Sequence, residues 1–147
     1  MQQPTEQDWE HDHFDSNLDV EYAYKHFAGK TLEQAEELFA ANALCYQEDL
    51  MWMPPTPFRY YICSYINYLL GNKSENDTDA ASCFIALVKH KLKCERENIL
   101  AVWNQVEETL KYICLHAQWF NWNESIYGNL EMEIAATFQA LNTQPKH

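Results

Sequence analysis

Histidine is the side chain that most often transfers protons or binds metal ions near neutral pH, and the chain has six of them. No H-x-x-x-H pair occurs, so the helical zinc-protease motif is absent. His11 and His13 flank Asp12, but ligands two positions apart in an irregular segment are not preorganised, so any divalent ion would bind them weakly. We therefore predict no metal site and no bound cofactor.

Motifs for nucleophilic catalysis and phosphate binding are also missing. The chain has no G-x-S-x-G, P-loop or G-x-G-x-x-G segment, and its three glycines cannot build a backbone cradle for phosphate. A cysteine beside a distant histidine stays an open route to hydrolysis, because sequence does not report spatial neighbours. The odd number of cysteines, without a C-x-x-C pair, favours free thiols in a reducing cytoplasm. They are Cys45, Cys63, Cys83, Cys94 and Cys114.

The charge balance narrows the classes of partner. Asp and Glu number 22 against 10 Lys and Arg, which gives a formal net charge of −12. Such a surface repels phosphate backbones and anionic lipid headgroups and attracts basic proteins, although acidity also simply keeps proteins soluble. The short basic run from Lys89 to Arg96 is typical of a helix C-terminus. We predict a basic protein partner, no nucleic-acid binding and no membrane binding.

The spacing of apolar residues predicts the elements that position these groups. Apolar side chains recur three and four positions apart, and no stretch alternates apolar and polar residues as a strand does. The clearest helical stripe comprises Phe58, Tyr61, Ile62, Tyr65, Ile66 and Leu69. We predict an all-α fold, a single compact bundle of about five or six helices with short loops at residues 16–147. Residues 1–15 are acidic and aperiodic and are predicted to form a flexible arm.

The segment from Glu48 to Tyr61, EDLMWMPPTPFRYY, combines acidic and aromatic residues around a bend. Its prolines should end one helix, and Thr56 is predicted to cap the next, with Pro57 in the first turn. Aromatic, Met and Arg side chains are enriched at the centres of protein contacts, but they could equally plug the end of the bundle. The predicted partner-binding residues are Glu48, Asp49, Trp52, Arg59 and Tyr60.

The same segment resembles a group of small bacterial proteins. The shared order is an acidic pair, then LMWMP, then PFRYY, and then further Tyr–aliphatic pairs in the following helix. The similarity covers residues 31–92 and is specific for a shape rather than for a reaction. Some proteins of this kind are encoded beside toxins and are suspected immunity proteins. The resemblance implies an inhibitory binding protein and carries over no catalytic residue.

The sequence thus predicts a cytoplasmic protein-binding module, an immunity or antitoxin-like inhibitor of a basic partner. Two alternatives stay open. One is a homodimer in which Tyr68 and neighbouring aromatics bury against a second copy. The other is an enzyme or small-molecule binder with an aromatic pocket between helices. The predicted pocket residues are Tyr61, Tyr65, Trp103 and His116.

Overall fold

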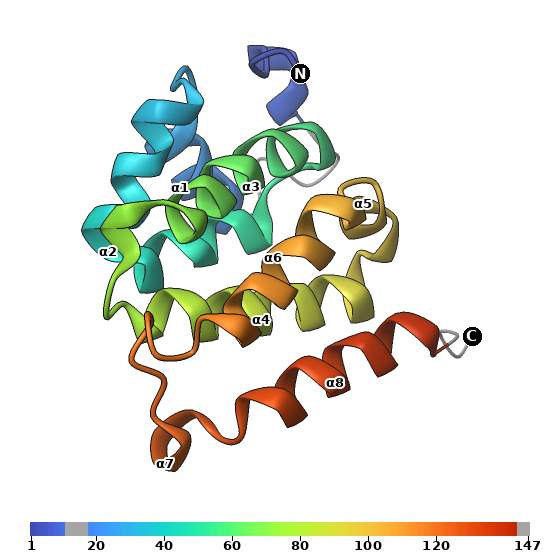
Figure 1. Cartoon of the computed structure of the whole chain (residues 1–147). Helices are drawn as coiled ribbons and strands as arrows, with labels where there is room; N and C mark the ends of the chain where they lie inside the picture. Colours follow the sequence, from blue (N-terminus) through green and yellow to red (C-terminus); the bar gives the residue numbers. More distant parts are fainter. Residues whose placement is uncertain (11–17, 144–147) are drawn as a thin grey trace.

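The computed structural model of the protein describes residues 1–10 and 18–143, and every regular element in these ranges is a helix. The predicted all-α fold is confirmed, although the described residues form more helices than the five or six expected (Figure 1). The helices are η1 (Glu6–Trp9), α1 (Leu18–Phe27), α2 (Leu32–Trp52), α3 (Pro55–Leu70), η3 (Asn72–Ser74), α4 (Thr78–Cys94), α5 (Arg96–Leu100), α6 (Trp103–Leu115), α7 (Glu124–Tyr127) and α8 (Leu130–Asn142).

Helix α3 is the central element, packed against η1, α2, η3, α5 and α6. All six residues of its predicted stripe are buried, which confirms the helical phase read from the sequence. The other sides are buried as well, because neighbours surround the helix: Tyr60 is 7% exposed and Tyr68 2%. The contacts predicted for these residues, Tyr60 with a partner and Tyr68 with a second copy, would need exposed side chains, and neither is exposed. The hydroxyl of Tyr68 donates to Asp77 at 2.5 Å within the bundle.

The N-terminal residues are not a loose arm as far as they are described. Trp9 at the end of η1 is 2% exposed, and its ring lies 5.5 Å from that of Tyr24 and 6.2 Å from that of Tyr61. One indole buries enough apolar surface to dock a short segment that has no helical periodicity of its own. Residues 11–15 of the predicted arm, including His11 and His13, lie outside the described residues.

The loop between α2 and α3 is shorter than the sequence predicted. Helix α2 continues to Trp52, and α3 begins at Pro55 with Pro54 as its N-cap, two residues before the predicted start. Proline fits here because the first N–H groups of a helix have no intrahelical partner. The ammonium group of Lys91 on α4 donates a hydrogen bond to the carbonyl of Met51 at 2.8 Å. It thereby satisfies a carbonyl in the last turn of α2.

Helix α2 is broken in its middle. Asn42 has φ −164° and ψ 82°, and its side chain accepts a hydrogen bond from the N–H of Cys45 at 3.1 Å. This is the N-cap arrangement that Asn prefers, so Asn42 ends one helical segment and starts the next. The residues from 43 to 52 therefore form a separate segment, whose exposed and buried faces are set independently of those of the first half.

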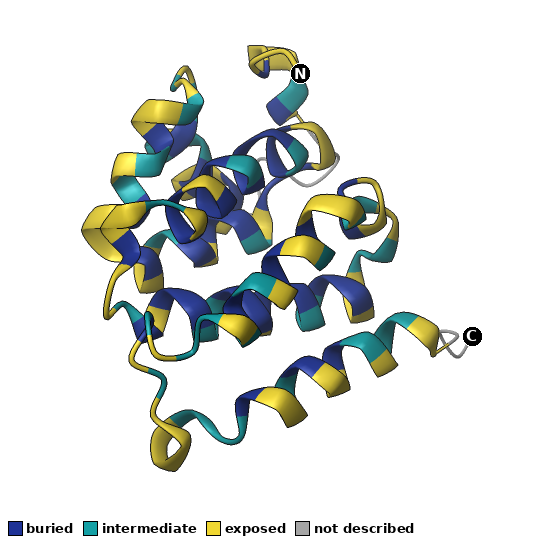
Figure 2. Ribbon diagram, in the orientation of Figure 1, coloured by how far each residue is buried: buried dark blue, intermediate teal, exposed yellow. Residues whose placement is uncertain are grey.

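The C-terminal helices close the bundle. Gly128 adopts φ 85°, a left-handed conformation that separates α7 from α8. Helix α8 packs against α4 and α6, with its exposed residues along the outer edge (Figures 1 and 2). Glu133 on α8 forms an ion pair with Lys89 on α4. None of the described helices is long and apolar enough to cross a membrane.

Candidate functional site

The second half of α2 presents an exposed row of mixed character. Leu44, Glu48 and Trp52 are four residues apart and therefore share one face of the helix. Leu44 is 55% exposed and Trp52 is 41% exposed. Large apolar side chains are usually buried when a chain folds. The accessible indole of Trp52, in a row with Leu44 and Glu48, is therefore typical of a contact surface.

Helix α1 borders this row on one side. The Nδ1 atom of His26 lies 2.7 Å from a carboxylate oxygen of Asp49 and joins the two helices. Burial raises the pKa of Asp49 above its usual value, and the hydrogen bond and charge of His26 oppose that rise. Leu18 and Tyr22, two turns and one turn before His26, are 68% and 55% exposed. We call Leu18, Tyr22, Leu44, Glu48 and Trp52 the α1–α2 surface.

Helix α4 borders the same row on its other side. The rings of Trp52 and His90 meet edge to face, with centroids 6.3 Å apart. The pKa of Cys83 is raised to about 11, first by burial, then by Asp79 and Asp77, and to a smaller extent by Glu48. Cys83 is therefore a protonated, weakly nucleophilic thiol at neutral pH, and this border offers packing rather than thiol chemistry.

The structure divides the five residues predicted to bind a partner. Glu48 and Trp52 lie on the α1–α2 surface, whereas Asp49 is 8% exposed and held by His26. Tyr60 is buried with its ring 4.9 Å from that of Tyr61. Arg59 is half-buried, and its Nε donates to the carbonyl of Pro55 at 3.2 Å. The expectation that Asp49 and Tyr60 are exposed is wrong, because neighbouring residues in a helix point in different directions.

The four residues predicted to line an aromatic pocket are not brought together. Tyr61 donates its hydroxyl to the carbonyl of Lys30 at 2.8 Å, and Tyr65 donates to that of Ala80 at 2.6 Å. Both tyrosines are fully buried in the core. Trp103 packs against Phe138 on α8, while the ring of His116 stacks on Tyr112 with centroids 3.8 Å apart. Each of these side chains serves a different packing contact, so no shared cavity results.

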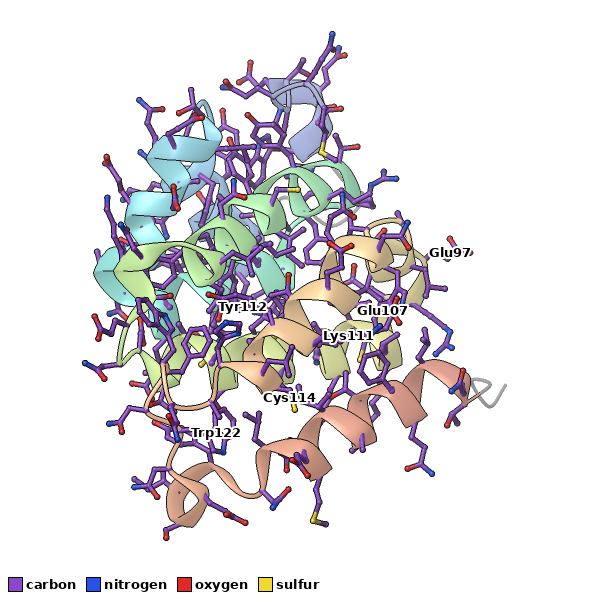
Figure 3. The ribbon with its side chains drawn as sticks, in the orientation of Figure 1. Glu97, Glu107, Lys111, Tyr112, Cys114 and Trp122 are labelled. Carbon is purple, nitrogen blue, oxygen red and sulfur yellow. The ribbon has the colours of Figure 1, made fainter. Side chains whose placement is uncertain are left out.

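A cleft does exist where sequence analysis placed none, between the end of α6 and the start of α8. Its volume is about 480 Å³. Figure 3 shows Cys114 on the side of α6 that faces α8, and Trp122 near α7. The lining residues are Cys114, Ala117, Gln118, Asn121, Trp122, Glu124, Asn129, Leu130 and Glu131. The sequence signal was the density of Asn and Trp from residue 118 to 129, interrupted by Gly128.

Hydrogen bonds fix the walls of this cleft. The indole N–H of Trp122 donates to the carbonyl of Gly128 at 2.8 Å. Asn129 caps α8 by accepting from the N–H of Met132 at 3.0 Å and donates to a carboxylate oxygen of Glu124 at 3.0 Å. Asn121 adopts φ 56°, which turns the chain sharply between α6 and α7. These bonds hold one indole and one carboxylate in set orientations at the cleft.

The described residues include no group of three or more His, Cys, Asp or Glu side chains that could hold a metal ion. The weak chelation considered for His11 and His13 falls outside those residues. The cysteines at 45, 63, 83, 94 and 114 are all free thiols, of which Cys45 and Cys94 are exposed.

Comparison with known proteins adds no assignment: no protein-family model, curated protein or solved structure matches this chain. The case for a function accordingly rests on the geometry of the α1–α2 surface and of the cleft.

Proposed function

We propose that the protein is a binding module that docks a basic partner protein on the α1–α2 surface and inhibits it, as an immunity protein inhibits its toxin. The observation that carries the proposal is the accessible indole of Trp52, in line with Leu44 and Glu48 on one helical face. Trp is among the residue types that most often dominate binding energy, because its large ring excludes water from a contact.

The charge of this region supports a basic partner. Asp19, Glu21 and Glu48 are exposed carboxylates on the two helices that form the surface, and Lys25 is the exposed base on α1. The formal net charge of −12 adds a long-range field of the same sign. Complementary charge raises the association rate, whereas desolvated aromatic contacts set the lifetime of the complex. The surface offers both components side by side.

The surface is also held rigid, which lowers the entropy lost on binding. The contact of His26 with Asp49 fixes α1 against α2. The bond from Lys91 to the carbonyl of Met51 fixes the turn that carries Trp52. The prolines that follow stop the helix immediately after that indole. Residues 31–92 resemble small bacterial proteins, some of which are encoded beside toxins, so a basic toxin is the first partner to test.

The test is a comparison of binding kinetics for matched variants. The immobilised protein captures candidate partners, including the products of neighbouring genes, and each purified candidate is measured at two salt concentrations. For the true partner, Glu48→Lys should mainly lower the association rate, and Trp52→Ala should raise the dissociation rate about 30-fold or more, the equivalent of about 2 kcal/mol. Association with the unmodified protein should slow as salt rises, because exposed charges are screened beyond about 8 Å at physiological ionic strength.

Controls come from the opposite part of the bundle. Glu108→Lys on α6 makes the same charge change, and Met132→Ala on α8 truncates a side chain that is 71% exposed. Both variants should bind within about twofold of the unmodified protein, since distant surface substitutions change little. Equal effects of Glu48→Lys and Glu108→Lys, with no effect of Trp52→Ala, would remove the α1–α2 surface as the docking site.

A further inference from the structure

The cleft between α6, α7 and α8 has a composition of its own, independent of the α1–α2 surface. Two of its lining residues, Glu124 and Glu131, are exposed carboxylates, and none of the described residues that line it is Lys, Arg or His. The described basic residues nearest in sequence, Lys111 and His116, both have partners. Lys111 lies 3.5 Å from Glu107, and the Nδ1 atom of His116 lies 2.8 Å from the carbonyl of Tyr112. The described lining of the cleft thus carries two negative charges and no basic side chain.

Neutral groups in the cleft complement those charges. The side chains of Gln118 and Asn121 supply carboxamide oxygens that can accept hydrogen bonds from a ligand, whereas that of Asn129 already accepts from the N–H of Met132. The indole N–H of Trp122 is occupied by the carbonyl of Gly128, and its ring packs on that of Tyr127 with centroids 5.4 Å apart, so the lining takes from Trp122 the remaining ring surface rather than the donor. An aromatic face attracts a cation, and Trp does so most strongly. Carboxylates, carboxamide oxygens and an indole all favour a positively charged ligand.

The size of the cleft suits an organic molecule. Its volume of about 480 Å³ falls within the range of about 300–1,000 Å³ found for small-molecule sites. A bare metal ion would leave most of that space unused. The lining is also one that an anion would not enter, because both carboxylates would repel it.

We infer that this cleft is a binding site for a small organic cation, an alkyl chain that ends in a primary ammonium group. The ammonium group lies between the carboxylates of Glu124 and Glu131 and donates to them. The alkyl chain lies against the ring of Trp122 and the side chain of Leu130, which extends the apolar part of the lining. Asn129 takes part indirectly, because its bond at 3.0 Å orients the carboxylate of Glu124.

The experiment titrates the ¹⁵N-labelled protein with putrescine and follows the indole N–H signal of Trp122 by NMR. Two molecules with the same four-carbon chain serve as matched probes, the neutral 1,4-butanediol and the anionic succinate. Substituting Trp122→Phe assigns the signal by removing it. Putrescine should shift this signal in a saturable manner, and neither matched probe should do so at the same concentrations.

Charge-matched variants separate a site from general attraction to an acidic protein. The double variant Glu124→Gln with Glu131→Gln should weaken putrescine binding about tenfold, because it removes both carboxylates that pair with the ammonium group and each exposed ion pair contributes modestly. The double variant Glu33→Gln with Glu37→Gln removes the same charge from exposed positions on α2 and should bind within about twofold of the unmodified protein. These four glutamates are at the surface, so loss of folding is not expected.

Three results would overturn the inference. They are the absence of a saturable shift at Trp122, an equal response to 1,4-butanediol, and an equal loss of binding in the two double variants. The last result would mean that putrescine merely gathers near a surface of net charge −12. None of these results bears on the docking of a basic protein at Trp52, so the two proposals fail separately.

Discussion

Replacing Lys91 by Met should destabilise the protein by removing a buried positive charge that holds two helices together. The side chain of Lys91 is fully buried, and its ammonium group donates to the carbonyl of Met51 at 2.8 Å and to Glu95 at 3.0 Å. The same group lies 4.4 Å from the centre of the Phe58 ring. Met fills nearly the same space as the lysine stem, so Lys91→Met removes the charge with little loss of packing.

The size of the effect follows from these contacts. A hydrogen bond from a charged donor contributes about 1.5–3 kcal/mol, and a cation over an aromatic ring about 0.5–2 kcal/mol. The lowered pKa of Lys91 shows that desolvation of the ammonium group costs more than its charge contacts return, so the loss in Lys91→Met comes from the carbonyl of Met51, which is left without its hydrogen bond. We expect a net loss of about 1–3 kcal/mol in the free energy of unfolding, or roughly 2–12 °C in melting temperature.

Urea unfolding of the unmodified protein, of Lys91→Met and of Lys93→Met measures this change in the free energy of unfolding directly. Lys93→Met provides the matched control, because Lys93 is exposed two residues further along α4, and its loss should change stability by less than about 0.5 kcal/mol. A Lys91→Met variant as stable as the unmodified protein would refute the reasoning. Buried charges can be replaced by apolar groups without loss when desolvation outweighs their bonds, and Lys91 would then be such a case.

The pH dependence of the same pair of proteins gives a second measurement. Because the pKa of Lys91 is lowered in the folded state, the unfolded chain holds this proton at higher pH than the folded protein does. The cost of burying the charge is fully present below the folded-state pKa and disappears as pH rises toward the unfolded value of 10.5. The unmodified protein should therefore gain stability relative to Lys91→Met over that interval.

Other expected outcomes concern the core, the tyrosines and the thiols. Truncating Ile66→Ala should cost about 2–5 kcal/mol by urea unfolding, and a loss below about 0.5 kcal/mol would contradict its burial. Burial raises the pKa of Tyr61 to about 12, so its contribution to stability is full below pH 10 and is lost as pH rises toward 12. Tyr61→Phe should reduce the fall of the free energy of unfolding at alkaline pH. An unchanged slope of that free energy against pH would argue against the raised pKa of Tyr61. Iodoacetamide should alkylate the exposed Cys45 and Cys94 well before Cys83, because the pKa of Cys83 is raised to about 11. Peptide mass mapping measures the order of alkylation, and the reverse order would contradict the placement of Cys83.

Sequence patterns predicted the helical class and the phase of α3 because both depend on local spacing. Phe58, Tyr61 and Ile66 recur with the helical period, and a period specifies a face wherever that face is buried. The same pattern says nothing about how many sides a helix buries. Tyr60 and Tyr68 follow no stripe, yet both are buried, because α3 lies at the centre of the bundle.

The sites show the same division between local and long-range information. The acidic and aromatic character of Glu48 and Trp52 was visible in one short segment, and these two residues do share a helical face. The contact of His26 with Asp49 joins residues 23 positions apart, and no local rule anticipates it. The cleft lies beside Gly128, whose positive φ separates α7 from α8. The burial of Trp9 was not predicted, because a single buried side chain in an irregular segment leaves no periodic pattern in the sequence.

The attachment of α8 has a consequence for how the protein opens. This last helix meets the rest of the chain through α4 and α6, while Arg96 donates hydrogen bonds to the carbonyls of Ala140 and Leu141 near its end. A terminal helix with neighbours on one side usually opens at lower free energy than a central helix such as α3, so we expect α8 to open as a separate cooperative unit. The wall of the cleft formed by Leu130 and Glu131 belongs to that unit. A ligand of the proposed site would bind only while α8 is attached, so occupancy of the cleft and detachment of α8 would be thermodynamically linked.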